Sequence, residues 1–206
     1  MVKLFGQKLN GSMLTLTDIT KSFTRQRVLE GVSLQVQAGE SLAVMGPSGS
    51  GKSTLLHCMS GVLTPDSGEV VFDGTNIAAL DDAARSKLRL NHFGFIFQDG
   101  QLLPELTATE NVALPQIMRG TSRKEAHEQA DDMLTRLGLG NFTSRFPGQL
   151  SGGQAQRVAI ARALAGPPKV VFADEPTAAL DQATGHEVMQ EIVAVAQKFG
   201  VTLVLV

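Results

Sequence analysis

Residues 46–54 read GPSGSGKST and carry the residue types that bind a polyphosphate. Glycines let the backbone curl until successive N–H groups point inward, where larger side chains would obstruct the anion. Lys52 adds a positive charge near the β and γ phosphates, and Ser53 offers its hydroxyl to Mg²⁺. The predicted phosphate-binding residues are Gly46, Ser48, Gly49, Ser50, Gly51, Lys52, Ser53 and Thr54.

The context of this loop supports the same interpretation. An apolar run at 41–45 precedes the loop and a helix-compatible run follows it, which is the arrangement that a phosphate loop requires. A Gly/Ser-rich linker before a helix is the alternative, but it does not explain why Lys52, Ser53 and Thr54 follow in register. The residues of the loop alone do not choose ATP over GTP.

Two carboxylates follow a second apolar run, at the edge where an open α/β sheet binds its ligand. The run VVFA at 170–173 delivers Asp174 and Glu175 to the C-terminal end of a predicted strand. One carboxylate can hold the hydration shell of Mg²⁺, and its neighbour can accept a proton from an attacking water. We assign Asp174 to the metal and Glu175 to the general base. Taken alone, the pair could also begin a turn or a helix, where acidic residues are favourable.

Residues 150–154 read LSGGQ and open a run with helical spacing. Ser151 and Gln154 fit a capping box, so a purely structural role is a serious alternative. Capping needs neither Gly152 nor Gly153, and each glycine costs on the order of 1 kcal/mol of helix stability relative to alanine. We interpret the two glycines as a place where a phosphate approaches the backbone.

Two kinds of apolar pattern describe the strands that must position these groups. Alternating segments predict an antiparallel sheet with one solvent-facing side. They lie at 14–17, 32–37 and 69–72. Continuous apolar runs predict strands buried on both faces, in a parallel sheet flanked by helices. They lie at 41–45, 93–97, 170–173 and 201–206.

A polar region from about 101 to 150 separates two of the predicted parallel strands and has helical spacing. Capping-box patterns at 107–110 and 122–125 predict where its helices begin. The chain therefore combines a two-sheet body with an inserted helical region.

Composition limits the functional classes. The formal net charge of −2 gives no electrostatic case for a nucleic-acid partner. The lone Cys58 excludes an internal disulfide, and a buried apolar role is predicted for it. No apolar run approaches the ~20 residues that span a bilayer, so we expect any membrane association to go through a partner.

The order of these motifs resembles that of one family, the ATP-binding cassette (ABC) transporter ATPases. The segments that resemble the Walker A, Q-loop, signature, Walker B and D-loop are 46–54, Gln98, 150–154, 170–175 and 179–181. The resemblance implies an α/β fold with a P-loop NTPase core, a mostly parallel sheet, an N-terminal antiparallel β-subdomain and an inserted α-helical subdomain. The implied single domain spans 13–206, with 13–99 and 152–206 as core and antiparallel sheet, 100–151 as helical subdomain and 1–12 as an extension.

The resemblance also implies a mode of action. Two copies of such a domain pair head to tail and enclose two ATP molecules, each held by the phosphate loop of one copy and the signature of the other. The signature residues implied to contact ATP in the second copy are Ser151, Gly152, Gly153 and Gln154. Asp181 would couple the two sites. Phe23 matches the aromatic that stacks on adenine, with packing inside the antiparallel sheet as the alternative.

The same resemblance implies which residues bind the metal and which take part in hydrolysis. Gln98 would sense Mg²⁺ and the attacking water, while the segment around it meets a membrane permease. The implied metal-binding residues are Ser53, Gln98 and Asp174. The implied catalytic residues are Glu175, Gln98 and Lys52.

The segments 93–98 and 102–112 are similar to the lipoprotein-release, macrolide-efflux and cell-division ATPases, which we expect to be separate from their membrane partners. This similarity implies an ATPase subunit that lies on the cytoplasmic face of the membrane through its permease. The alternative is a soluble ABC-type ATP switch without a permease. Such switches resemble tandem cassettes or carry long coiled coils, whereas this chain has one cassette and no heptad run.

One departure from the family concerns turnover. The family places a histidine just after the strand that 201–206 resembles, and this sequence ends at Val206. The four histidines lie elsewhere, one on the helix after the phosphate loop and three at expected surface positions: His57, His92, His127 and His186. We therefore expect the 206-residue chain to bind ATP–Mg²⁺ and to hydrolyse it slowly or not at all.

Overall fold

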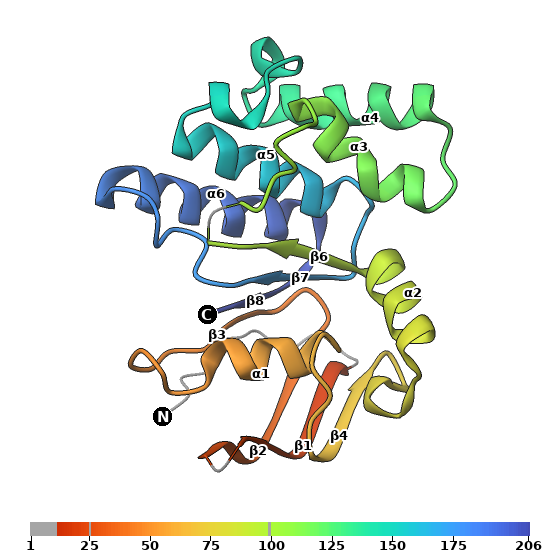
Figure 1. Ribbon diagram of the computed structural model, residues 1–206, viewed down its shortest axis with the longest axis vertical. Helices are drawn as coiled ribbons and strands as arrows, with labels where there is room; N and C mark the ends of the chain where they lie inside the picture. Colours follow the sequence, from red (N-terminus) through yellow and green to blue (C-terminus); the bar gives the residue numbers. More distant parts are fainter. Residues whose placement is uncertain (1–11, 25, 99) are drawn as a thin grey trace.

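The computed structural model describes residues 12–24, 26–98 and 100–206 (Figure 1). The proposed extension at 1–12 therefore lies outside the described residues except for Ser12. The strands are β1 (Ser12–Phe23), β2 (Gln26–Gln37), β3 (Ser41–Ala43), β4 (Ser67–Phe72), β5 (Thr75–Asn76), β6 (Phe93–Ile96), β7 (Val170–Ala173) and β8 (Thr202–Leu205). The α-helices are α1 (Lys52–Met59), α2 (Asp82–His92), α3 (Ala108–Met118), α4 (Arg123–Arg136), α5 (Gly152–Leu164) and α6 (Gln182–Phe199). Short 3₁₀ helices are η1 (Ile77–Ala79), η2 (Gly140–Phe142) and η3 (Pro147–Gln149).

A parallel sheet with the strand order β3-β8-β7-β6 forms the centre of the molecule. Residues of β7 alternate between two hydrophobic cores. Val170 and Phe172 belong to the core that contains α1, whereas Val171 and Ala173 belong to the core that contains α5 and α6. Burial on both faces explains the continuous apolar runs of these strands and confirms the predicted parallel sheet.

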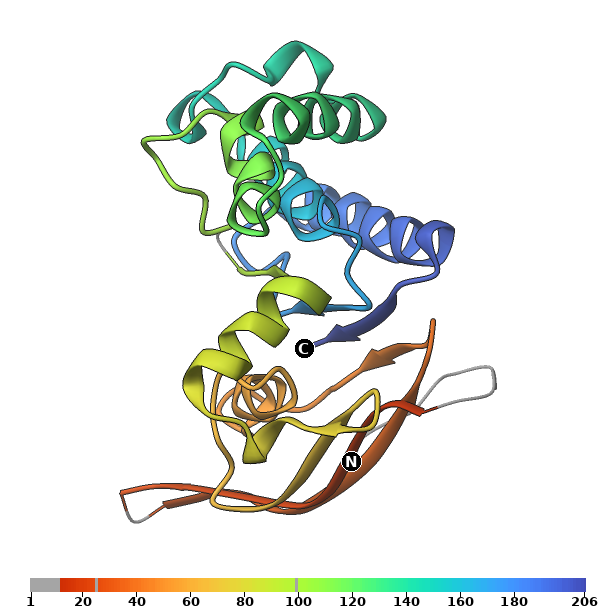
Figure 2. The same cartoon turned by 90° about the vertical axis from the view of Figure 1, so that its right-hand side faces the viewer.

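The antiparallel sheet has the order β2-β1-β4-β5 and is solvated on one side. In β1, Leu14 and Leu16 are buried while Thr17 is exposed, which is the predicted alternation. Helix α1 lies between the antiparallel and parallel sheets in both views (Figures 1 and 2). Leu55 and Met59 of α1 fill the core that the two sheets share.

Helices α3 to α6 lie on the opposite face of the parallel sheet (Figure 1). Thr107 and Glu110 form the predicted capping box at the start of α3. Ser122 caps α4 by accepting the Glu125 N–H at 3.3 Å, which is one half of the predicted box. The predicted helical region between β6 and β7 is therefore confirmed.

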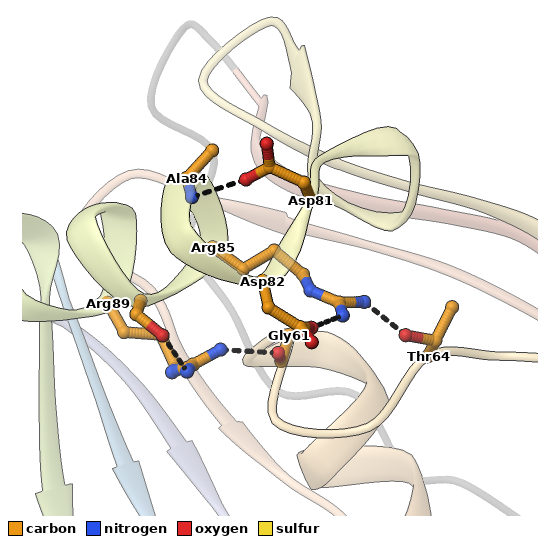
Figure 3. A network of polar contacts seen from close by, with 8 residues as sticks. Gly61, Thr64, Asp81, Asp82, Ala84, Arg85 and Arg89 are labelled. Atoms are coloured by element: carbon orange, nitrogen blue, oxygen red, sulfur yellow. Dashed lines mark hydrogen bonds and ion pairs between the residues drawn. The ribbon is translucent and has the colours of Figure 1, made fainter.

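The apolar patterns considered in the sequence analysis do not predict helix α2, in which no residue is fully buried. Polar contacts attach it to the chain that follows α1 (Figure 3). Arg85 contacts Asp82 and Thr64, and Arg89 Nη1 donates to Gly61 O at 2.6 Å. Helix α2 therefore reaches β6 in a fixed position, and its partly buried Leu88 packs against the core that contains α1.

Cys58 lies on α1 within the core between the two sheets. Burial raises the pKa of its thiol to about 11, so the thiol stays protonated at neutral pH. The predicted buried role of this cysteine is confirmed. Within the described ranges, none of the helices has the length and apolar character needed to cross a membrane.

Candidate nucleotide-binding site

The loops after β3 and β7 meet at the C-terminal edge of the parallel sheet. Ser53 Oγ donates a hydrogen bond of 2.9 Å to Asp174 Oδ1, although the two residues are far apart in the sequence. A cavity of about 220 Å³ lies here, lined by Ser53, Phe97, Gln98, Gln101, Asp174 and Glu175. The structure therefore brings together the three predicted metal-binding residues and the predicted base.

The donor atoms at this cavity suit Mg²⁺. A serine hydroxyl, an aspartate carboxylate and a glutamine amide all offer oxygen, and Mg²⁺ prefers one or two carboxylates completed by water and phosphate oxygens. Within the described ranges, no cluster of three or more His, Cys, Asp or Glu residues could hold a metal by itself. The oxygen donors of Ser53, Gln98 and Asp174 fit a Mg²⁺ ion whose remaining ligands are water and phosphate oxygens.

The phosphate loop has the conformation that its glycines allow. Gly49 and Gly51 have φ values of 77° and 88°, in the left-handed region that other residues rarely adopt. A Cβ on Gly51 would lie 2.8 Å from Val28 Cγ1, so this position also lacks space for a side chain. Both glycines are therefore required by the backbone geometry of the loop.

Helix α1 begins at this loop without a side-chain cap and without an acidic residue in its first turn. Helix N-termini present N–H groups that lack helical partners and carry a partial positive charge. Lys52 Nζ donates to Pro47 O at 3.1 Å, which places the ammonium over the loop. Lys52 and the start of α1 together suit the phosphates of a nucleotide.

Phe23 lies at the end of β1 and is 46% exposed. Lys21 Nζ lies 5.8 Å from the centroid of its ring. Phe23 does not line the cavity of about 300 Å³ beside the phosphate loop, which is bounded by residues such as Val28, Val44 and Lys52. Its role in adenine stacking stays a prediction, while its exposure argues against packing in a core.

Glu175 has a φ of 44°, which is unusual for a residue with a side chain. Its N–H donates to Val206 O at 3.0 Å, and the Asp174 N–H donates to Ile96 O at 2.9 Å. Such strained residues cost of order 1–3 kcal/mol and gather at functional sites. The backbone bonds on both sides of β7 hold the two carboxylates at the cavity despite this cost.

The signature turn forms the complete capping box that was the structural alternative. Ser151 Oγ accepts the Gln154 N–H at 3.3 Å, and Gln154 Oε1 accepts the Ser151 N–H at 2.9 Å. The structure also gives the two glycines a packing role. A Cβ on Gly152 would lie 3.0 Å from Leu180 Cδ2, and one on Gly153 would lie 2.9 Å from Thr184 Cγ2. The interpretation that both glycines are present only to let a phosphate approach the backbone is therefore incomplete.

Asp181 begins helix α6 beside this turn. Its Oδ1 accepts the N–H groups of Ala183 and Thr184, each at 3.1 Å. Hydrogen bonds from Thr184, followed by that from Ala183, lower the pKa of Asp181. Ser151, Gly152, Gly153 and Asp181 line one cavity of about 420 Å³, whereas the predicted ATP contact Gln154 does not line it. This cavity shares no lining residue with the two cavities beside the phosphate loop.

We expect Gly153→Ala to destabilise the fold by about 1 kcal/mol, because its new methyl group would overlap Thr184 Cγ2. Such overpacking costs about 1–3 kcal/mol, which outweighs the roughly 1 kcal/mol that alanine gains over glycine in a helix. The measurement is urea denaturation. The double variant Gly153→Ala/Thr184→Ser, which removes that methyl group from residue 184, should regain most of the loss. Gly148→Ala is the matched control, since a Cβ there meets nothing within 4 Å. Unchanged stability of Gly153→Ala would mean that packing does not require this glycine.

Two observations about histidines change the sequence interpretation. His57 Nε2 lies 3.6 Å from Asp174 Oδ2, a contact that the sequence patterns did not single out. Its spacing of one helical turn from Ser53 was the available signal. The expected surface position is correct for His186, whereas His92 and His127 are half-buried. Burial, and after it Lys169 and Arg119, lowers the pKa of His92.

The glycine loop leads into α1, and Asp174 faces it from the end of β7. This arrangement defines the phosphate-loop class of nucleoside triphosphatases. Comparison with known proteins narrows this class. The family model described as ABC transporter matches residues 29–178, which is most of the chain. The chain belongs to the ABC transporter ATP-binding family and is an ABC-type ATPase.

Individual relatives agree with this assignment. The chain is 47% identical over 199 residues to a lipoprotein-releasing system ATP-binding protein, LolD, of Geobacter metallireducens, covering 95% of this chain and 88% of the relative. It is 44% identical over 198 residues to a macrolide export ATP-binding/permease protein, MacB, of Marinobacter nauticus, covering 94% of this chain and 31% of the relative. The expectation that macrolide-efflux relatives are separate from their permease is wrong for this one, whose name joins both.

Solved structures give the same fold. The ATP-binding cassette MJ0796, in a dimeric post-hydrolysis state bound to ADP and Pi, is 41% identical to this chain. The alignment has a TM-score of 0.84 and covers 94% of this chain and 87% of that one. The predicted fold class, with its antiparallel and parallel sheets, is confirmed.

Proposed function

We propose that this chain is the ATP-hydrolysing subunit of a membrane transporter and acts as a head-to-tail dimer. The observation that carries the proposal is the separation of the phosphate loop from the signature turn, the two surfaces proposed to contact the nucleotide. The phosphate loop and the signature residues line cavities with no residue in common, so one chain does not surround a nucleotide. A second copy in the opposite orientation would place its signature over the first copy's phosphate loop. That a related cassette is dimeric with ADP and Pi bound supports pairing of two copies.

The residues around the phosphate loop would share the chemistry as follows. Ser53, Gln98 and Asp174 would hold Mg²⁺, which when bound neutralises phosphate charge and polarises the γ-phosphoryl group. Lys52 would add a positive charge against the phosphates. Glu175 would accept the proton of the attacking water at its carboxylate, and Gln98 would orient that water.

The groups proposed to complete the site come from the second copy. Ser151 and its neighbouring glycines would contact the γ-phosphate through a hydroxyl and backbone N–H groups. Asp181 lies beside them on the same cavity and would link the two sites across the dimer. ATP binding would then favour closure of the dimer, and hydrolysis would release it.

We also propose the division of the chain that accompanies this function. A single domain would span 13–206, with 13–99 and 152–206 as core and antiparallel sheet and 100–151 as helical subdomain. Helices α3 and α4 pack against each other between β6 and β7, which supports the helical part, and they share one core with α5, α6 and the parallel sheet. Relatives named for lipoprotein release and macrolide export support a membrane partner, which would place this chain at the cytoplasmic face of the membrane.

The segment from Gln98 to 106 is the proposed contact with the permease, and Leu103 in it is 43% exposed. We expect affinity purification from solubilised membranes to recover a polytopic membrane protein with the chain. Leu103→Arg should lose that protein, because an arginine disrupts an apolar contact. Phe199→Arg, at an equally exposed apolar residue on α6, is the matched control. Co-purification of ribosomes or DNA instead would favour a soluble ABC-type switch and contradict the proposal.

A further inference from the structure

Helix α1 directs two side chains toward one carboxylate. Ser53 and His57 are one helical turn apart, so they lie on the same face of α1. Ser53 Oγ donates to Asp174 Oδ1 at 2.9 Å, and His57 Nε2 lies 3.6 Å from Asp174 Oδ2. Each oxygen of the Asp174 side chain therefore has its own neighbour on the same helix.

The surroundings of Asp174 leave few other constraints on its side chain. Its N–H donates to Ile96 O at 2.9 Å, which fixes the main chain but not the rotation of the carboxylate. Among the described residues, His57 is the one cationic or potentially cationic side chain within ion-pair distance of it. The side chains of His57 and Asp174 are 35% and 17% exposed, so water screens their contact only in part.

The distance between His57 Nε2 and Asp174 Oδ2 shows how closely the ring approaches the carboxylate. At 3.6 Å the contact is longer than a direct hydrogen bond. A shift of about 0.5 Å would bring the two atoms within hydrogen-bonding range. The ring of His57 thus favours one rotation of the carboxylate, the rotation that keeps Oδ1 at Ser53.

We propose that His57 is a positioning residue, which orients the Asp174 carboxylate and thereby raises the affinity of the site for nucleotide-bound Mg²⁺. The inference rests on the proposed function, because it requires Asp174 to be the metal-binding carboxylate. Groups that orient a metal ligand typically contribute about 10- to 100-fold in metal affinity. His57 does not line the cavity itself, so its action goes through Asp174.

The test compares nucleotide affinity with and without a divalent metal. The probe is ATPγS, titrated calorimetrically into the chain in the presence of Mn²⁺ and, separately, in EDTA. His57→Leu should weaken ATPγS binding about 10-fold with Mn²⁺ and leave it unchanged in EDTA. His57→Gln should recover most of the affinity, because its amide can donate to Oδ2. His186→Leu, an exposed histidine that contacts Gln190 at 2.9 Å, is the matched control and should behave as the parent.

Several outcomes would overturn the inference. Equal affinity of His57→Leu and the parent with Mn²⁺ would show that Asp174 needs no such partner. If His57→Leu lost ATPγS affinity equally with Mn²⁺ and in EDTA, the substitution would have a general effect on the phosphate loop. Failure of His57→Gln to recover affinity would have the same meaning. If His57→Leu does not fold, His57→Ala replaces it in the same comparison. A parent chain without any metal-dependent affinity would instead contradict the proposed function, which keeps the two failures distinct.

Discussion

Glu175→Gln should remove the ATP turnover that the parent chain shows and trap an ATP-bound dimer. Glutamine has nearly the same size as glutamate but cannot accept the proton of the attacking water. Loss of a general base typically lowers the rate between about 10²- and 10⁴-fold. The phosphate loop, Ser53 and Asp174 remain in place, so nucleotide binding should persist. Phosphate release measures turnover, and a sizing column run with ATP and Mg²⁺ measures assembly.

The dimer readout does not depend on how fast the parent chain hydrolyses ATP. Glu69→Gln, on the exposed side of β4, is the matched control, because it makes the same change of charge away from the site. It should elute as the parent does. A monomer of Glu175→Gln with bound ATP would count against the proposed sandwich of two copies.

The parts of the fold that could be predicted from the sequence are those in which the local apolar pattern depends directly on burial. Val170 and Val171 face different cores, and a strand buried on both sides has to be apolar at every position. Because ligand-binding loops gather at the C-terminal edge of such a sheet, the approach of Ser53 to Asp174 also followed from topology.

The parts that did not follow depend on how elements pack against one another. Helix α2 is held by arginine contacts and by the partly buried Leu88, and none of its residues is fully buried. The fit of Gly153 against Thr184 requires α5 and the start of α6 to lie side by side, and no spacing within either segment states that. The contact of His57 with Asp174 also could not be predicted from spacing within one segment, because it depends on the rotation of α1 about its axis.

Lys52→Met should weaken ATP binding about 10- to 100-fold, because a charge-assisted hydrogen bond is worth about 1.5–3 kcal/mol. Methionine keeps the unbranched apolar stem and removes the ammonium that lies over the loop at Pro47 O. Calorimetric titration with ATPγS and Mg²⁺ measures the loss. Lys198→Met, on the exposed end of α6, is the matched control and should bind as the parent does.

Combining the two variants tests whether nucleotide at the phosphate loop causes the assembly. Glu175→Gln removes proton acceptance after binding, whereas Lys52→Met removes the binding charge itself. The dimer that Glu175→Gln traps should therefore disappear in Lys52→Met/Glu175→Gln at an ATP concentration below the weakened dissociation constant, and return as ATP is raised about 100-fold. A dimer of the double variant that persists without added ATP would show that the two copies associate without a nucleotide between them. The signature glycines would then serve the packing against Leu180 and Thr184 rather than a phosphate.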